Sequence, residues 1–259
     1  MAAIRATSRF GIALFACGLL VDACAADADY AREDRLVAEA VPAIVVGDPV
    51  YLATSHRTSV LAIFTMPEVK PVGGAVIVHG LGVHADWGLI NGLRTDLSDA
   101  GIATLSVQMP VLAADASRAD YAALYPEAGE RIAAGIAFLR SRGIGKIAIV
   151  AHSLGAVMAD RYLASSGGSG VAAWVPIGMQ GGFAAAARQP VLDVIAQNDV
   201  PEVLDVAPIR ANGCRATPAR ARSRSAGPIT SWQIGARNWR KTSGHSSRVR
   251  STRAADTTL

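Results

Sequence analysis

The sequence predicts an α/β protein with a mostly parallel, doubly wound sheet that begins with an antiparallel hairpin. Strand-like apolar runs alternate with helical patterns from Gly74 to Ala196, the order expected of a parallel sheet covered on both faces. Two β-branched runs ahead of this region are separated by a short polar turn, which predicts the hairpin. Within the alternation, one apolar strand runs into a tight turn and then directly into a helix.

Short apolar runs predict the strands, and longer runs with helical periodicity predict the helices. The predicted strands are Val50–Thr54, Ser59–Thr65, Gly74–Val78, Ile102–Val107, Lys146–Val150, Val171–Ile177 and Val191–Ala196, and the predicted helices are Leu89–Leu97, Ala128–Arg142 and Ala156–Leu163. The polar stretch Asp27–Glu39 and the turn residue His56 are expected at the surface. Val111–Glu127 is irregular, and we expect it over the carboxyl ends of the strands, where open α/β sheets bind ligands.

The stretch Ala151-His152-Ser153-Leu154-Gly155 carries the clearest chemical signal. A strand, a sharp turn with a serine and a helix in immediate succession are the context of a nucleophile elbow. The turn is so tight that the residues two before and two after the serine must be small, and Ala151 and Gly155 meet this condition. Ser153 is therefore the candidate nucleophile. His152 is only the variable residue of the motif, and we do not expect it to act as the base for its neighbour.

A second turn, His79-Gly80-Leu81-Gly82, is rich in glycine and follows the predicted strand Gly74–Val78. A turn of this kind can direct backbone N–H groups towards a developing negative charge. The alternative interpretation is a turn that does no more than end the strand.

The first 25 residues have the pattern of a signal peptide. Arg5 and Arg9 form a basic start, Phe10–Val21 is an apolar run too short to span a bilayer comfortably, and Ala23-Cys24-Ala25 supplies a cleavage pattern. A soluble N-terminal helix and a poorly matched lipoprotein site are the alternatives. We expect cleavage near Ala25 and an exported bacterial protein, periplasmic or secreted, with no stable membrane span afterwards.

The cysteine content and the charge distribution limit which cofactors and partners the sequence predicts. Cys17 and Cys24 leave with the signal peptide, which leaves Cys214 alone, and no Cys/His cluster predicts a metal or an organic cofactor. The net charge of +4 conceals −6 in residues 1–209, with 14 basic and 20 acidic side chains, and +10 in residues 210–259, with 11 basic side chains and one Asp. A basic tail ordinarily favours nucleic acid or a membrane surface, but a frameshift explains it better, and we expect no nucleic-acid partner.

From Val50 to Arg210 the chain resembles the α/β-hydrolase superfamily. It is more narrowly similar to an uncharacterised family of exported bacterial proteins with that fold, in the stretches His79–Pro110 and Pro190–Leu204 and in the elbow itself. The resemblance implies that Ser153 is the nucleophile of a Ser-His-Asp mechanism. The narrower family has no assigned substrate and adds little about function.

The superfamily pattern also implies the other site residues. The oxyanion donors are the N–H groups of Leu154, directly after the nucleophile, and of Leu81, in the turn after the earlier strand. The acid is expected after the strand Val191–Ala196, where Asp199 lies, and Asp193 inside that strand is a weaker candidate. Asp199 would orient a histidine and stabilise its imidazolium, although an acid at this place can also simply cap a loop.

The histidine that should follow Asp199 has no suitable context in this chain. His245 is the one histidine beyond it, and from about Asn212 onwards the chain consists mainly of Arg, Ser, Ala, Thr and Gly, a composition that cannot bury a core. We therefore expect the final strand and helix of the fold to be missing or disordered. The tail is either a real basic segment or the product of a frameshift near Ala211–Ser223.

A frameshift accounts for the composition of the tail. With one choice of codons from Gly227 onwards, another reading frame encodes Ala-Asp-His-Phe-Val-Ala-Asp and then a segment of helical periodicity. The missing base would be encoded across Ile229 and Thr230, and the nucleotide sequence of the gene tests this interpretation. The chain as written would be poorly stable and nearly inactive, because a triad without its base loses most of its rate.

The sequence divides into a signal peptide (1–25), an α/β-hydrolase domain (26–210) and a basic tail (211–259). The expected function is hydrolysis of an ester-type acyl bond in a small-molecule or lipid-like substrate, and the apolar part of Val111–Tyr125 favours a hydrophobic group. The alternative is a non-catalytic protein of the cell envelope that uses the same fold to bind a ligand or a partner.

Overall fold

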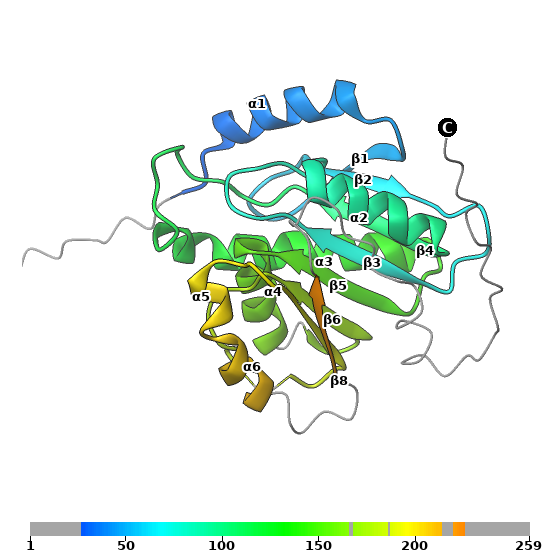
Figure 1. The fold of residues 1–259 in the computed structure, drawn as a ribbon. Coiled ribbons are helices and arrows are strands. Elements are labelled where there is room, and N and C mark those ends of the chain that lie inside the picture. Colours follow the sequence, from blue (N-terminus) through cyan, green and yellow to red (C-terminus); the bar gives the residue numbers. More distant parts are fainter. Residues whose placement is uncertain (1–26, 166–167, 186, 214–219, 226–259) are drawn as a thin grey trace, which may run out of the picture.

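The computed structural model describes residues 27–165, 168–185, 187–213 and 220–225. Within these ranges the chain forms an eight-stranded sheet in the order β1-β2-β4-β3-β5-β6-β7-β8 (Figure 1). The pairs β1–β2 and β2–β4 are antiparallel and the other pairs are parallel, which confirms the predicted fold class. The expected signal peptide, His245 and the positions Ile229 and Thr230 lie outside the described residues.

The predicted elements are present, with ends that differ by a few residues. The strands are β1 (Asp48–Leu52), β2 (Val60–Thr65), β3 (Gly73–Val78), β4 (Ile102–Val107), β5 (Ile147–His152), β6 (Ala173–Ile177), β7 (Val191–Ala196) and β8 (Arg220–Ser225). The α-helices are α1 (Tyr30–Ala40), α2 (Gly88–Asp99), α3 (Tyr125–Ser141), α4 (Leu154–Ala164), α5 (Pro201–Leu204) and α6 (Ala207–Gly213), and the short 3₁₀ helices are η1 (Val41–Ala43) and η2 (Asp120–Leu124). Pro126 lies in the first turn of α3, where its missing N–H costs no hydrogen bond.

Apolar side chains are buried on both faces of the sheet. On one face Val76 and Ile149 pack with Ile132 of α3, in a cluster that also includes residues of α4. On the other face Ile77 packs with Leu93 of α2. Successive residues of a strand point to opposite faces, so a strand covered on both sides reads as one continuous apolar run. This explains why the sequences of β3 and β5 are continuous apolar runs.

Most of Asp27–Glu39 lies at the surface, as expected, but helix α1 carries one acid that is internal. The side chain of Glu33 is fully buried, and its carboxylate accepts two hydrogen bonds of 2.9 Å from the guanidinium of Arg131 on α3. Glu127 pairs with the same guanidinium. The partners Glu33 and Arg131 are 98 residues apart, so a local pattern of charges could not reveal that this acid is internal.

Strand β8 corrects the expectation that the last strand is missing. It pairs in parallel with β7, with Arg220 opposite Val191 and Ser225 opposite Ala196, and it forms the edge of the sheet opposite to β1 (Figure 1, orange). A strand pair is held by backbone N–H and C=O groups, which polar residues supply as well as apolar ones. The polar composition of this segment therefore did not exclude a strand. The expectation that the final helix is missing or disordered concerns positions outside the described residues.

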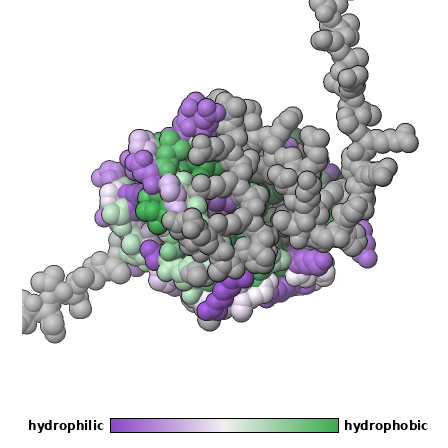
Figure 2. All heavy atoms as spheres, turned by 60° about the horizontal axis from the view of Figure 1, so that its bottom comes forward, coloured by the Kyte–Doolittle hydropathy of each residue, from purple (hydrophilic) through white to green (hydrophobic). Residues whose placement is uncertain are grey.

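The described residues expose both hydrophilic and large apolar side chains. Figure 2 shows hydrophobic and hydrophilic residues side by side on the face that it brings forward. Large apolar side chains that are exposed after the carboxyl ends of β3 and β7 are Leu81, Trp87, Val200 and Leu204. No helix in the described part of the chain is long and apolar enough to cross a membrane.

Candidate active site

Ser153 lies at the turn between β5 and α4 in a strained backbone conformation. Its φ is +53° and its ψ is −119°, and it is the only non-glycine residue with positive φ among the described residues. Such a conformation costs of order 1–3 kcal/mol and persists only where the surroundings enforce it. The N–H of Ser153 donates to the carbonyl oxygen of Ile177 on β6 at 2.8 Å. The strand, turn and helix expected of a nucleophile elbow are all present.

The small residues of the motif allow the elbow to touch the turn after β3. A Cβ atom at Gly155 would overlap the carbonyl oxygen of His79, so no larger residue fits there. A Cβ atom at Gly80 would lie 3.3 Å from the Cβ of Ser153, and the side chain of Ala151 is buried. The two loops that follow β3 and β5 are therefore in direct contact.

His79 is a buried, neutral part of this turn. The N–H of Met109 donates to its Nε2 atom at 2.8 Å, so the proton lies on Nδ1, which donates to the carbonyl oxygen of Gly80 at 2.8 Å. Burial lowers the pKa of His79 to about 4. Both ring nitrogens are used to hold the turn, and His79 is not available as a base.

Gly82 completes the turn and connects it to α1. Its φ is +67°, a conformation that favours glycine. Its carbonyl oxygen accepts a hydrogen bond of 3.3 Å from Arg32, which also donates to the carbonyl oxygen of Leu112 at 2.5 Å. Helix α1 thus braces the turn that carries Leu81.

The two leucines expected to hold an oxyanion occupy the loops that meet at the elbow. Leu154 is the first residue of α4, so its N–H belongs to the first-turn groups that have no acceptor within the helix. The helix N-terminus also carries partial positive charge. Leu81 lies in the turn after β3, next to Gly80, and its side chain is 40% exposed.

Asp199 follows β7, as expected from its place in the chain. Its carboxylate accepts hydrogen bonds from the N–H groups of Ala196 at 3.3 Å and Val200 at 3.0 Å, so it caps its own loop. It also lies beside Gly178, the residue after β6, where an added Cβ would be 3.4 Å from its Oδ2. Asp193, the weaker candidate for the acid, accepts a hydrogen bond of 3.1 Å from the buried Arg210 of α6. This ion pair gives Asp193 a structural role.

The ring of His152 lies against the ring of Trp87, and His152 makes no hydrogen bond to the Ser153 hydroxyl in the described structure. The two rings stack with centroids 6.2 Å apart and an interplanar angle of 20°. Its Nδ1 atom is buried without a hydrogen-bond partner in the described structure. Burial lowers the pKa of His152, while the nearby charge of Asp199 opposes this shift. Among the described residues no histidine hydrogen-bonds to the Ser153 hydroxyl.

Arg118 is the side chain that does reach the Ser153 hydroxyl, and sequence reasoning missed it. Its Nη2 atom donates to Ser153 Oγ at 3.0 Å. It belongs to Val111–Glu127, the segment expected to lie over the ends of the strands. The sequence held one signal for this role: Arg118 is the one basic residue in Val111–Glu127.

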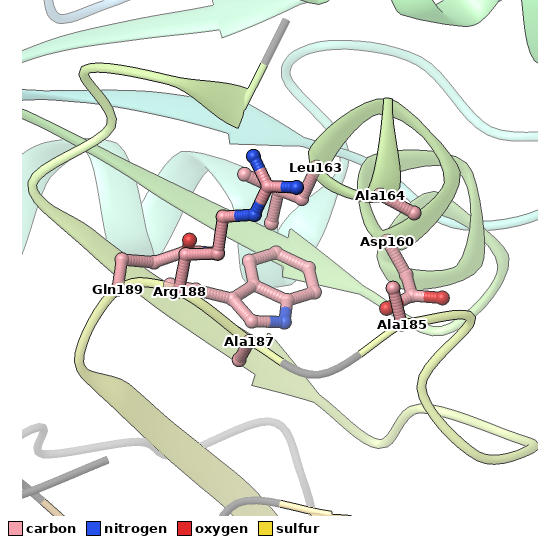
Figure 3. A pocket seen from close by; sticks show the side chains of 8 residues that line it. Asp160, Leu163, Ala164, Ala185, Ala187, Arg188 and Gln189 are labelled. Atoms are coloured by element: carbon pink, nitrogen blue, oxygen red, sulfur yellow. The ribbon is translucent and has the colours of Figure 1, made fainter. Parts of the chain in front are cut away.

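A small pocket lies away from the elbow, beside the C-terminal half of α4 (Figure 3). Asp160, which lines it near Ala185, is seven residues beyond Ser153, or about 10 Å along the helix. The pocket volume is about 10 Å³, near the smallest that holds one water molecule, so it is too small for an ester substrate. No group of three or more His, Cys, Asp or Glu side chains in the described residues is arranged to hold a metal.

The sheet and the elbow define the class of protein: this chain has the α/β-hydrolase fold. Residues 54–130, from the hairpin turn to the start of α3, match a family described as a protein of unknown function, DUF3530. No curated protein matches the chain.

Solved structures with this fold are similar over most of the chain at low identity. A dienelactone hydrolase from Anabaena variabilis has a TM-score of 0.57 at 15% identity, covering 76% of this chain and 95% of its own. An esterase from Pyrococcus furiosus has a TM-score of 0.57 at 12% identity, with 76% and 88% covered. Est1E from Butyrivibrio proteoclasticus has a TM-score of 0.51 at 14% identity, with 69% and 88% covered. At these identities the likeness concerns the fold.

Proposed function

We propose that this protein is a serine hydrolase that cleaves an ester-type acyl bond. The observation that carries the proposal is Ser153, held at a φ of +53° on the turn between β5 and α4. A strained serine at this place exposes its hydroxyl at the carboxyl end of the sheet and directs a helix N-terminus at the reacting atoms. Neighbours in fold that are described as an esterase and as a serine hydrolase homologue support the same reaction class.

In the proposed mechanism Ser153 Oγ attacks the scissile carbonyl carbon while a histidine takes the hydroxyl proton. The N–H groups of Leu154 and Leu81 stabilise the tetrahedral oxyanion, and Asp199 orients the imidazole. Collapse of the intermediate expels the alcohol, which takes the proton from the histidine. Water then hydrolyses the acyl-enzyme by the same sequence of proton transfers.

The catalytic histidine is part of the proposal and comes from another reading frame. It would be encoded across the codons of Ile229 and Thr230, after a frameshift near Ala211–Ser223. The proposed substrate is a small-molecule or lipid-like ester with a hydrophobic group, which the exposed Leu81 and Trp87 support. The basic and apolar pattern of residues 1–25 supports export to the periplasm or the medium.

A fluorophosphonate probe tests the proposed reaction, because it labels activated serine nucleophiles covalently. We expect labelling of a frame-corrected protein, loss of labelling in Ser153→Ala, and labelling at least about 100-fold slower in the chain as printed, which lacks the base. Circular dichroism checks that all three proteins are folded. A folded frame-corrected protein that takes no label contradicts the proposal.

The alternative is a non-catalytic protein of the cell envelope that binds a ligand or partner through the same fold. One observation favours it: in the described structure Ser153 Oγ is bonded to an arginine, and no histidine bonds to it. The absence of labelling in the folded, frame-corrected protein would support this second function.

A further inference from the structure

The guanidinium of Arg118 has no carboxylate within ion-pair distance among the described residues. Nη2 donates to the neutral hydroxyl of Ser153 at 3.0 Å, while Nη1 is buried and has no hydrogen-bond partner. A buried donor without an acceptor is unfavourable, and more so when it is charged. This site therefore favours an incoming anionic acceptor.

Partial burial of the Arg118 guanidinium makes an anionic partner more favourable. Burial lowers the pKa of Arg118, and the nearby groups that oppose this shift are Tyr125 and Glu202. Arginine stays protonated in proteins even when its pKa is lowered. The positive charge is therefore present at the elbow, and among the described residues Glu202 acts on it only from beyond ion-pair distance.

The loop that carries Arg118 is held in place by its own hydrogen bonds. The N–H and the hydroxyl of Ser117 both donate to the carboxylate of Asp120, at 2.8 Å each. The N–H of Leu112 donates to the buried hydroxyl of Tyr121 at 3.1 Å. These bonds anchor the backbone on both sides of Arg118, whose side chain contacts Ser153 from this loop.

We propose that Arg118 determines specificity by binding a carboxylate of the substrate, close to the ester bond that Ser153 attacks. This rests on the proposed serine hydrolase function. The planar guanidinium fork matches a carboxylate with two parallel hydrogen bonds, and Nη1, buried without an acceptor in the described structure, is one arm of that fork. Because Nη2 lies at the nucleophile, the bound carboxylate must lie a few bonds from the scissile carbonyl. The substrate class is a half-ester of a short dicarboxylic acid, with an apolar alcohol towards Leu81 and Trp87.

A binding experiment on the full chain tests this without requiring turnover. The protein carries Ser153→Ala so that no ester is cleaved, and the ligand is monomethyl glutarate, measured by isothermal titration calorimetry. Adding Arg118→Met should weaken binding by about 10- to 100-fold, the range for a hydrogen bond to a charged group. Arg118→Lys keeps the charge without the fork. Its affinity for monomethyl glutarate should lie between that of the Ser153→Ala protein and that of the protein that also carries Arg118→Met. Methyl 5-methylhexanoate, with an isopropyl group in place of the carboxylate, should bind equally with and without Arg118→Met.

The matched control is Arg35→Met, which removes an exposed arginine of α1 and should leave binding unchanged. Equal affinity for monomethyl glutarate with and without Arg118→Met, in proteins that circular dichroism shows to be folded, overturns the proposal. So does an equal loss in the Arg35→Met control. If the fluorophosphonate probe fails but Arg118→Met still weakens binding, the hydrolase proposal fails while the carboxylate site stands.

Discussion

At the scale of single residues, the conformation of the elbow is imposed by contacts from neighbouring strands. The strain of Ser153 is offset by the hydrogen bond from its N–H to Ile177 and by close packing against Gly80. His79 holds the adjacent turn with both ring nitrogens. Because these contacts are short and directional, the serine and its neighbouring backbone N–H groups are positioned before any substrate arrives.

A buried carboxyl on α4 gives a pH-dependent prediction. Asp160 is 5% exposed, accepts a hydrogen bond of 2.7 Å from the N–H of Ala184, and has its pKa raised by burial to about 6. A folded pKa above the unfolded value of 3.8 means that the folded state binds more protons between these two values. Ionisation of Asp160 therefore lowers the free energy of unfolding as the pH rises through about 6.

Asp160→Asn should remove this cost while keeping an oxygen acceptor for Ala184. We expect the variant to be more stable than the parent by about 2–3 kcal/mol at pH 8 and equal to it near pH 4, as measured by urea denaturation. Asp115→Asn, at an exposed position, is the control and should show no such pH-dependent gain. A gain that is the same at pH 4 and pH 8 would contradict the assigned cause.

At the scale of elements, α1 is a brace between the hairpin, α3 and the turn after β3. Glu33 binds Arg131 of α3, Arg57 of the hairpin turn pairs with Asp34, and Arg32 donates to Gly82. One amphipathic helix thus connects the fold to the loop that would bind an oxyanion. Three of its charged side chains, one buried and the others more exposed, bind residues outside the helix.

Removing the buried partner in α1 should be far more damaging than removing the exposed one. Glu33→Ala leaves Arg131 buried with less compensation and should lower the free energy of unfolding by about 3–5 kcal/mol, measured by urea denaturation at pH 7. Asp34→Ala removes a carboxylate whose side chain is 63% exposed and should cost less than about 1 kcal/mol. Similar losses for both variants would mean that burial does not set the strength of these pairs.

At the scale of the whole molecule, the sheet is bounded by β1 at one edge and β8 at the other. Without β8 the backbone groups along β7 would have no partner on that side, and such an edge recruits strands from other chains. The segment that covers this edge belongs to the basic part of the chain, residues 210–259. The tail thus includes one element of the fold.

Two shortened chains test the role of β8. A chain ending after Gly213 lacks the strand, and one ending after Ser225 keeps it. We expect the shorter protein to self-associate at concentrations where the longer one is monodisperse in size-exclusion chromatography with light scattering, and to unfold at a lower temperature. Identical behaviour of the two chains would show that β7 needs no partner on that side.

Local patterns in the sequence were sufficient for the order of the elements and for the elbow. The continuous apolar runs of β3 and β5 predict strands covered on both faces, and the small residues Ala151 and Gly155 predict a turn in which strand and helix touch. Both signals depend on side-chain size and period within a few residues. Asp199 could be placed by the same reasoning, because its position follows from the strand before it.

Only the tertiary structure decided which distant groups meet. The burial of Glu33 depends on Arg131, the pairing of Arg220–Ser225 depends on an open edge at β7, and the contact of Arg118 with Ser153 depends on the path of a loop across the strand ends. Periodicity records which side of an element is apolar, but the partner of a charge or of an edge lies elsewhere in the chain. The sequence by itself therefore determined the fold class and the candidate nucleophile, and the packing of the chain determined the charge that faces it.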